Sequence, residues 1–331
     1  MKKLINGTDS IVDEMLEGMV RAYPRHIRRL EGFDAVVRAN GSRGKVALVS
    51  GGGSGHEPAH GGYVGKGMLD GAIAGAVFTS PTPDQVYEAI KAADGGKGVL
   101  LIIKNYTGDV MNFEMAADMA RDEGIEVEQV ITADDVAVEN STWTTGRRGI
   151  AGTVFVHKIA GACAEAGGVL VEVKRVAEKV IENVRSMGMA LKACTVPAMG
   201  KPGFDLAENE VEIGIGIHGE PGVSRERITS ADAIVDKLLE KILAEGIYNS
   251  GDEVAVIVNG MGGTPVMELF IANRHLNEAL REKGIGVYRT LVGNFMTSLD
   301  MEGFSITLLK LDEELKALLD APCDTPALVQ A

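Results

Sequence analysis

A glycine-rich segment near residue 50 gathers side chains that can do chemistry. It reads Ser50-Gly51-Gly52-Gly53-Ser54-Gly55-His56-Glu57-Pro58-Ala59-His60. Imidazole and carboxylate groups can move protons or bind a metal ion, and glycines let a ligand approach the backbone. The segment follows an apolar run, residues 45–49, that is typical of a buried strand. Its position therefore predicts a metal centre or a small-molecule site.

The metal hypothesis rests on His56-Glu57-Pro58-Ala59-His60, which has the form of a zinc-protease motif. That motif works only inside a helix, where both histidines share one face. Pro58 opposes a helix because proline lacks the amide donor and clashes with the carbonyl of Ser54. Tyr63 stands where the extended motif has glycine, so we expect no metal. Two interpretations remain, a turn with two surface histidines or a loop that presents His56 as an acid or base.

A second polar segment, Lys104-Asn105-Tyr106-Thr107-Gly108-Asp109, follows the predicted strand 98–104. Open α/β folds bind ligands at the carboxyl ends of their strands. Asp109 could act there as a general base. It could also cap a helix that begins at Val110, and the spacing alone favours the cap.

Residues 214–219 fit the G-x-G-x-x-G pattern of dinucleotide-binding proteins. In those proteins the glycines follow a strand and open a helix. Here they lie within an alternating strand pattern, residues 210–217, and a Glu220-Pro221-Gly222 turn follows. Dinucleotide binding is therefore not favoured, and the sequence has no P-loop. His218 is left as a histidine at a strand end between glycines, with a structural or a catalytic role.

The elements that must position these side chains alternate between strand and helix. In the first half we expect strands at 46–49, 72–78, 98–104 and 126–132, and helices at 83–90, 110–123, 153–165 and 170–191. In the second half we expect strands at 210–217, 253–258, 286–292 and 305–309, and helices at 230–245 and 312–319. We expect a further helix whose first residue is Pro265, with Thr264 as its N-cap. The alternation predicts an α/β fold with two domains, each a mixed or parallel sheet flanked by helices. Residues 1–188 form the N-terminal domain with the glycine-rich segment, Lys104 and Asp109, and residues 189–331 form the C-terminal domain with His218.

Composition excludes several classes of function. The 331 residues carry a net charge of −14, which repels nucleic acid and anionic membrane surfaces. The widely spaced Cys163, Cys194 and Cys323 form no C-x-x-C pair, so we expect neither a disulfide framework nor a structural zinc site. Without a signal peptide or a membrane-length apolar run, the sequence predicts a cytoplasmic protein. The basic segment 140–149 could approach an anion or pair with carboxylates.

Taken together, these segments resemble one family, the dihydroxyacetone kinase K subunit, over nearly the whole chain. The resemblance rests on residues 50–58, 67–69, 75–81, 104–109, 148–153, 216–222 and 259–264. It implies a two-domain α/β subunit in which the histidine that matches His218 attacks the carbonyl of dihydroxyacetone and forms a hemiaminal. His56 matches the acid/base histidine, and Asp109 matches the carboxylate that accepts the proton of the phosphorylated hydroxyl. Gly53, Ser54, Gly55 and Lys104 are placed in the same substrate site.

The resemblance also implies where the phosphoryl group comes from. A chain that stops soon after its last expected helix resembles the free-standing subunit of the phosphotransferase-system branch. There an L subunit carries ADP or ATP with Mg²⁺, and an M subunit recharges it from phosphoenolpyruvate. This chain is then expected to form a homodimer and to bind no cofactor or metal itself. The alternative is a paralogue that binds dihydroxyacetone through the same histidine and co-activates a transcription regulator. His56, Lys104 and Asp109 favour the enzyme.

Overall fold

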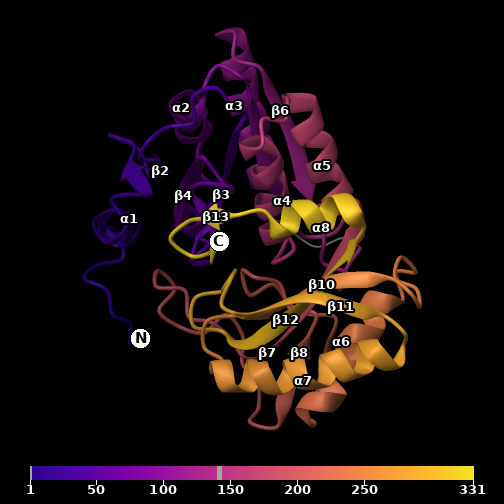
Figure 1. The fold of residues 1–331 in the computed structure, drawn as a ribbon. Coiled ribbons are helices and arrows are strands. Elements are labelled where there is room, and N and C mark those ends of the chain that lie inside the picture. Colours follow the sequence, from indigo (N-terminus) through magenta and orange to yellow (C-terminus); the bar gives the residue numbers. More distant parts are fainter. Residues whose placement is uncertain (1, 140–143) are drawn as a thin grey trace.

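The computed structural model describes residues 2–139 and 144–331, and within them the chain forms two larger β-sheets with helices between and outside them. Figure 1 shows the resulting layers, with one sheet in the upper half of the molecule and the other below it. The predicted fold class, α/β with helix-flanked sheets, is confirmed.

The first sheet is built from the N-terminal half and has the order β1-β2-β4-β3-β5-β6. Its strands are β1 (Ile27–Arg29), β2 (Ala35–Arg38), β3 (Ala47–Ser54), β4 (Gly71–Val77), β5 (Val99–Lys104) and β6 (Val127–Thr132). Strands β4, β3, β5 and β6 run parallel to one another, and β2 joins β4 in antiparallel fashion. The carboxyl ends of the parallel strands therefore meet at one edge, where the predicted site residues follow β3 and β5.

The second sheet has the order β11-β10-β12-β7-β8-β9. Its strands are β7 (Val184–Lys192), β8 (Glu210–Ile213), β9 (Ser224–Arg227), β10 (Glu253–Gly260), β11 (Gly286–Gly293) and β12 (Glu302–Leu311), and a small ribbon near the C-terminus pairs β13 (Cys323–Asp324) with β14 (Val329–Gln330). β10 and β11 are parallel, whereas β10 with β12 and β12 with β7 are antiparallel. The sheet is therefore mixed, as expected for this half of the chain.

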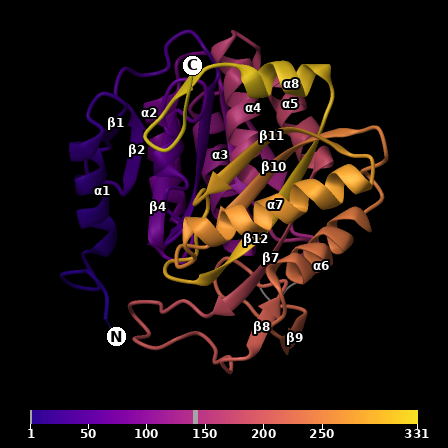
Figure 2. The same ribbon diagram turned by 60° about the horizontal axis from the view of Figure 1, so that its bottom comes forward.

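Helices cover both faces of each sheet. The helices are α1 (Ile11–Ala22), α2 (Pro83–Ala93), α3 (Thr107–Asp122), α4 (Thr153–Glu165), α5 (Leu170–Asn183), α6 (Ala231–Leu243), α7 (Val266–Glu282) and α8 (Glu313–Asp320), with a short 3-10 turn η1 (Gly61–Tyr63). In β5, Leu101 and Ile103 pack toward α2 and α3, while Leu100 and Ile102 pack toward α4 and α5. A strand buried on both faces has a continuous apolar sequence, which is the pattern seen in residues 99–103. In the turned view, α6 and α7 cover the outer face of the second sheet (Figure 2).

Several predicted boundaries are confirmed and others are wrong. Thr82 caps α2 with Pro83 at its first position, as expected. The helix predicted over 170–191 is too long, because α5 ends at Asn183 and residues 184–192 form β7, which pairs with β12. Met187 and Met189 alternate into the core between the second sheet and α6, and that strand register overrides the helical period. The proposed division at 188/189 runs through β7 and remains a prediction.

Two helix starts were also predicted wrongly. α3 begins at Thr107, so Asp109 lies in its first turn and is not its N-cap. α7 begins at Val266 with Pro265 as N-cap, one residue later than expected. The first error matters for function, because it places the Asp109 carboxylate at a helix N-terminus, where the helix dipole stabilises an anion.

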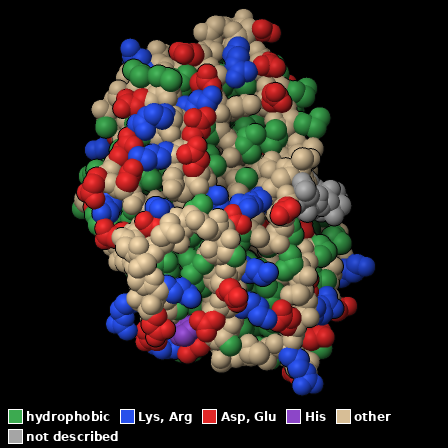
Figure 3. All heavy atoms as spheres, turned by 90° about the vertical axis from the view of Figure 1, so that its right-hand side faces the viewer, with side chains coloured by type: hydrophobic (Ala, Val, Ile, Leu, Met, Phe, Trp, Pro, Cys, Tyr) green, Lys and Arg blue, Asp and Glu red, His purple; other side chains and the backbone are tan. Residues whose placement is uncertain are grey.

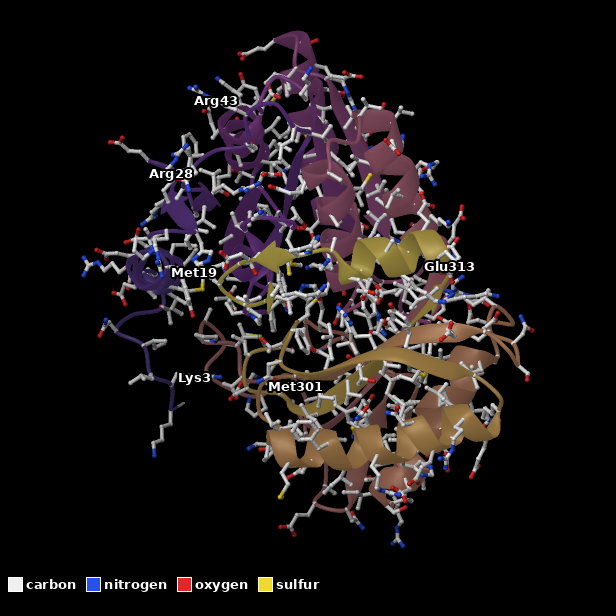
Figure 4. All side chains as sticks on the ribbon, in the orientation of Figure 1. Lys3, Met19, Arg28, Arg43, Met301 and Glu313 are labelled. Atoms are coloured by element: carbon white, nitrogen blue, oxygen red, sulfur yellow. The ribbon has the colours of Figure 1, made fainter. Side chains whose placement is uncertain are left out.

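The outside of the molecule is acidic but mixed in sign. On the face shown in Figure 3, positive and negative side chains alternate over the surface. Near the N-terminus, Lys3 Nζ lies 2.5 Å from Asp300 Oδ1, and Figure 4 shows Lys3 beside Met301.

The cysteines are buried and unpaired. No helix in the described part of the chain is long and apolar enough to cross a membrane.

Candidate active site

The first part of the glycine-rich segment, residues 50–54, is the end of strand β3 and not, as predicted, part of a loop after a strand, whereas residues 55–60 follow the strand. A Cβ atom at Gly51 would lie 2.7 Å from the carbonyl oxygen of Ile73, and one at Gly53 would lie 2.5 Å from the amide nitrogen of Thr79. Glycine at both positions lets β3 run against β4 and its following turn as far as Ser54. The strand thereby delivers His56 to the carboxyl edge of the sheet.

A pocket of about 740 Å³ opens at this edge. The N-terminal half contributes Gly53 and residues from the segments 78–80 and 106–112, and the C-terminal half contributes residues from the segments 193–204 and 218–221. The pocket therefore exists only because the two halves meet. It brings Gly53, Asp109 and His218 together, three residues that the sequence placed in one site.

His218 is held by a carboxylate that the sequence analysis did not assign to the site. Its Nδ1 lies 3.1 Å from Glu220 Oε1, and its backbone N–H donates to Glu220 Oε2 at 2.9 Å. Because an ionised carboxylate only accepts hydrogen bonds, the proton of the neutral ring is on Nδ1. Nε2 then carries a free lone pair. The pattern predicts a nucleophilic or ligand-binding nitrogen at Nε2.

His56 lies fully buried behind His218. The centroids of the two rings are 4.7 Å apart with an interplanar angle of 79°, and Phe78 stacks on His56 at 5.2 Å. Nδ1 of His56 donates to the carbonyl of Thr297 at 2.8 Å, so Nε2 is again the unprotonated nitrogen. Burial holds the pKa of His56 well below its usual 6.5, and the charges of Lys104 and His218 lower it further. The ring is therefore neutral at physiological pH.

Asp109 lines the pocket and Lys104 is buried next to it, and we call this pair the polar floor of the site. A Cβ atom at Gly52 would lie 3.0 Å from Lys104 Nζ and 3.4 Å from Asp109 Oδ2, so both groups border this glycine. Within the described residues, neither Lys104 Nζ nor Asp109 Oδ1 has a hydrogen-bond partner. Burial lowers the pKa of Lys104, against the opposing charges of Asp109 and Glu220. Unpaired buried polar atoms are costly, which indicates a ligand that offers hydroxyl groups to them.

Ser54 and Gly55 lie beside the pocket but do not line it. The Ser54 hydroxyl donates to the carbonyl of Gly75 at 2.7 Å and so fastens β3 to β4. The amide of Gly55 donates to the Glu57 carboxylate, and a Cβ atom there would lie 2.8 Å from the ring of Phe78. Their observed contacts support the shape of the site.

The zinc-motif geometry is absent. His56 reaches Thr297, whereas His60 Nδ1 lies 2.9 Å from His157 Nε2 on α4, so the two histidines are directed to different partners. Both rings are buried, which also excludes the alternative of two surface histidines. In the parts of the chain that the structure describes, no three histidine, cysteine or acidic side chains form a metal-binding group.

Other residues at the site also escaped the sequence analysis. The Tyr106 ring lies edge-on to His218 with centroids 4.5 Å apart, and Phe78 adopts a positive φ of 55°, which is strained for an aromatic residue. Tyr106 stands within a segment that the sequence had already singled out. In the basic segment 140–149, residues 140–143 lie outside the described residues, and Arg147 and Arg148 pair with Glu245 and Asp135. Pairing with carboxylates is thus the better of its two interpretations.

The chain is similar to a known domain family and to several known proteins over nearly its whole length. The model of the Dak1 domain matches residues 17–327. Over 328 residues the chain is 57% identical to the PTS-dependent dihydroxyacetone kinase 1, dihydroxyacetone-binding subunit DhaK, of Listeria innocua, covering 99% of this chain and 100% of that protein. The crystal structure of the dihydroxyacetone kinase of C. freundii superposes with a TM-score of 0.92 at 38% identity, covering 99% of this chain and 60% of that longer one. The dihydroxyacetone kinase operon co-activator superposes with a TM-score of 0.91 at 37% identity, covering 96% and 98%.

Proposed function

We propose, from the premise that this chain belongs to the Dak1 domain family, that it is the substrate-binding subunit of a dihydroxyacetone kinase. The observation that carries the proposal is the arrangement of His218 and Glu220, in which Nδ1 is held by the carboxylate and Nε2 is left as a nucleophile at a pocket. A ketone is electrophilic, and a neutral imidazole nitrogen can add to it. The substrate would therefore be bound covalently on His218.

The covalent step would proceed as a balanced addition. The Nε2 lone pair of His218 forms the new C–N bond, and the π electrons of the carbonyl move to its oxygen. The Nδ1 proton of His218 is released to Glu220, and the oxygen takes up one proton in its place, which Nε2 of His56 would first accept from a solvent molecule in the open pocket and then pass on. One proton is lost and one is gained, so the charge is unchanged once Glu220 returns its proton to solvent. The product is a neutral hemiaminal. Glycerol has no carbonyl and could not form it, so capture would discriminate by reaction type.

The polar floor would then prepare the substrate for phosphorylation. Lys104 Nζ and Asp109 would receive the hydroxyl groups of the adduct, which supplies the partners they lack within the described residues. Asp109 would accept the proton of the attacking hydroxyl. Phosphoryl transfer depends mainly on positioning and electrostatics, and a covalently held ketose is well positioned.

We assign the phosphoryl donor to other proteins. An L subunit would carry the nucleotide and Mg²⁺, an M subunit would draw on phosphoenolpyruvate, and this chain would act as a homodimer without a cofactor of its own. The similarity to a subunit described as PTS-dependent supports this arrangement. The test is a coupled assay with L and M subunits, phosphoenolpyruvate and dihydroxyacetone. Formation of dihydroxyacetone phosphate is expected, and its dependence on each component would identify the donor chain.

A second function has one supporting observation, the similarity to the operon co-activator. A co-activator would capture the ketose on His218 and signal its presence without phosphorylating it. The same coupled assay separates the two functions. An adduct on His218 without any product, in the presence of active L and M subunits, would select the co-activator.

A further inference from the structure

The segment 294–299 follows strand β11 and holds His56 in place. The amide of Thr297 donates to the backbone carbonyl of His56 at 3.2 Å, and its own carbonyl accepts the Nδ1 proton of the His56 ring at 2.8 Å. Phe78 stacks on this ring and fixes its plane, but stacking does not decide which nitrogen faces Thr297. Within the described residues Nε2 of His56 has no hydrogen-bond partner. The Thr297 carbonyl is therefore the contact there that sets which way the ring is turned.

Asn259, near the carboxyl end of β10, sets the course of this segment. Its side chain is buried and uses its full hydrogen-bonding capacity. Oδ1 accepts from the backbone amides of Phe295 and Met296, at 2.9 Å each, and Nδ2 donates to the carbonyl of Met296 at 2.7 Å and to Ser305 Oγ at 3.2 Å. The pairing of β10 with β11 ends at Asn259 and Gly293, and beyond that point the Asn259 amide takes the place of a strand backbone.

Two consecutive peptide units of the segment are held at both ends. In the unit 295–296, the carbonyl accepts from the Tyr63 hydroxyl at 2.5 Å and the amide donates to Asn259 Oδ1. In the unit 296–297, the carbonyl accepts from Asn259 Nδ2 and the amide donates to the backbone of His56. A peptide unit is planar, so holding both of its ends fixes its orientation. Asn259 thereby determines how the next carbonyl along the chain faces His56 Nδ1.

Glycines beside Asn259 let the two segments lie this close together. A Cβ atom at Gly260 would lie 2.4 Å from Asn294 Oδ1, and one at Gly262 would lie 2.0 Å from the carbonyl oxygen of Leu299. The segment 259–264, which stood out in the sequence without a role in the site, is thus the surface on which 294–299 rests.

We propose that Asn259 is a positioning residue for the proton transfer assigned to His56. Together with Tyr63 it holds the backbone of 295–297, so that the Thr297 carbonyl keeps the ring proton on Nδ1 and leaves Nε2 to exchange protons. Asn259 does not line the pocket and acts only through Thr297 and His56. The inference rests on the proposed function, because it concerns the histidine that moves a proton there.

The direct test observes the His56 hydrogen bond in the ligand-free protein. A buried, hydrogen-bonded ring N–H exchanges slowly with water and gives a ¹H–¹⁵N signal, which His56→Asn would identify by its absence. We expect this signal in the natural protein and its loss in Asn259→Ala. Thr264→Val is the matched control, because Thr264 lies in the same segment 259–264 and makes two buried hydrogen bonds, both to Gly303. A folded Asn259→Ala protein with the natural signal would overturn the proposal.

A milder variant covers the case in which Asn259→Ala does not fold. Tyr63→Phe keeps the ring and removes only the hydroxyl that holds the unit 295–296. We expect the His56 ring proton to exchange with water faster than in the natural protein, by roughly 2- to 10-fold, the effect of losing one hydrogen bond. If Asn259→Ala is unfolded, an unchanged exchange rate in Tyr63→Phe would overturn the proposal.

A second measurement follows the adduct with dihydroxyacetone. A proton carrier speeds formation and reversal alike, so its displacement slows both and leaves the equilibrium occupancy near its natural value. A misplacement of about 1 Å can cost roughly 10²-fold in rate, and we expect adduct formation in Asn259→Ala to slow by up to that factor. Adding Asn259→Ala to His56→Asn should slow it little further, because both act through one ring. Additive losses, or reduced occupancy at the natural rate, would refute the assignment.

The two measurements separate this inference from the proposed function. The ring-proton signal needs no ketose. Absence of an adduct in the natural protein would therefore refute the proposed function, whereas the natural ring-proton signal in folded Asn259→Ala would refute the role of Asn259.

Discussion

The imidazole rings of His56 and His218 meet edge to face, with centroids 4.7 Å apart, although they belong to different halves of the chain. Thr297 holds the Nδ1 side of His56, and Glu220 holds the Nδ1 side of His218. Each ring therefore offers Nε2 to a ligand. Two histidines presented in this way can divide one task, with one nitrogen forming a bond and the other moving a proton.

Replacing His218 by asparagine should abolish the ketose adduct, because no nucleophilic nitrogen remains at the pocket. Intact mass under non-denaturing conditions, or a crystal soaked with dihydroxyacetone, would detect the adduct on the natural protein. His275→Asn is the control, since His275 pairs with Asp236 on the outer side of the second sheet. An adduct of unchanged occupancy in His218→Asn would remove this residue from the nucleophile role.

Asp109→Asn should separate capture from phosphorylation. The amide keeps the shape of the side chain but cannot accept a proton, and loss of general base catalysis typically costs about 10²- to 10⁴-fold in rate. We expect the adduct to form while the coupled assay loses turnover by that factor. Asp84→Asn, which alters an exposed acid in the first turn of α2, should leave both measurements unchanged. Full turnover in Asp109→Asn would exclude the assigned role.

Gly53→Ala should damage the site through its backbone. The new Cβ atom would lie 2.5 Å from the amide nitrogen of Thr79 and 2.8 Å from the backbone of Phe78, which has little freedom to move. We expect weaker ketose binding and a lower free energy of unfolding, by about 1–3 kcal/mol for overpacking. Gly18→Ala in α1 meets nothing within 4 Å and should stabilise the protein slightly. Equal behaviour of the two variants in urea unfolding and ketose titration would contradict this account.

The sequence predicted well where one local signal decides the structure. The apolar run before Lys104 identified a strand buried on both faces, and Pro83 after Thr82 identified a helix start. It failed where distant contacts decide, as at residues 184–192, whose strand register depends on β12. The same distinction between local and distant signals applies to the residues of the site. His56, Asp109 and His218 stood out by type and surroundings. Glu220 was taken for part of a turn, because its contact with His218 depends on the fold of its loop.

Acid should destabilise the protein through three buried histidines. Burial, helped by the charge of Lys104, lowers the pKa of His157 to about 3 and holds the pKa values of His56 and His60 well below 6.5. Below pH 6.5 the unfolded chain therefore binds protons that the folded chain does not. The free energy of unfolding is unaffected above pH 6.5 and falls as the pH drops toward the folded-state pKa values, by about 1.4 kcal/mol per pH unit for each such histidine.

The contribution of one histidine can be isolated by substitution. Asp135 opposes the trend, because burial raises its pKa to about 6 and the folded state then gains a proton near that pH. Asp135 is present in the variant and in the natural protein, so its contribution cancels when their free energies of unfolding are compared. His157→Gln keeps a polar group next to His60. Between pH 6 and 5 its free energy of unfolding should fall less steeply than that of the natural protein, by about 1.4 kcal/mol per pH unit. Identical slopes for His157→Gln and the natural protein in urea unfolding would show that His157 takes up its proton in the folded state.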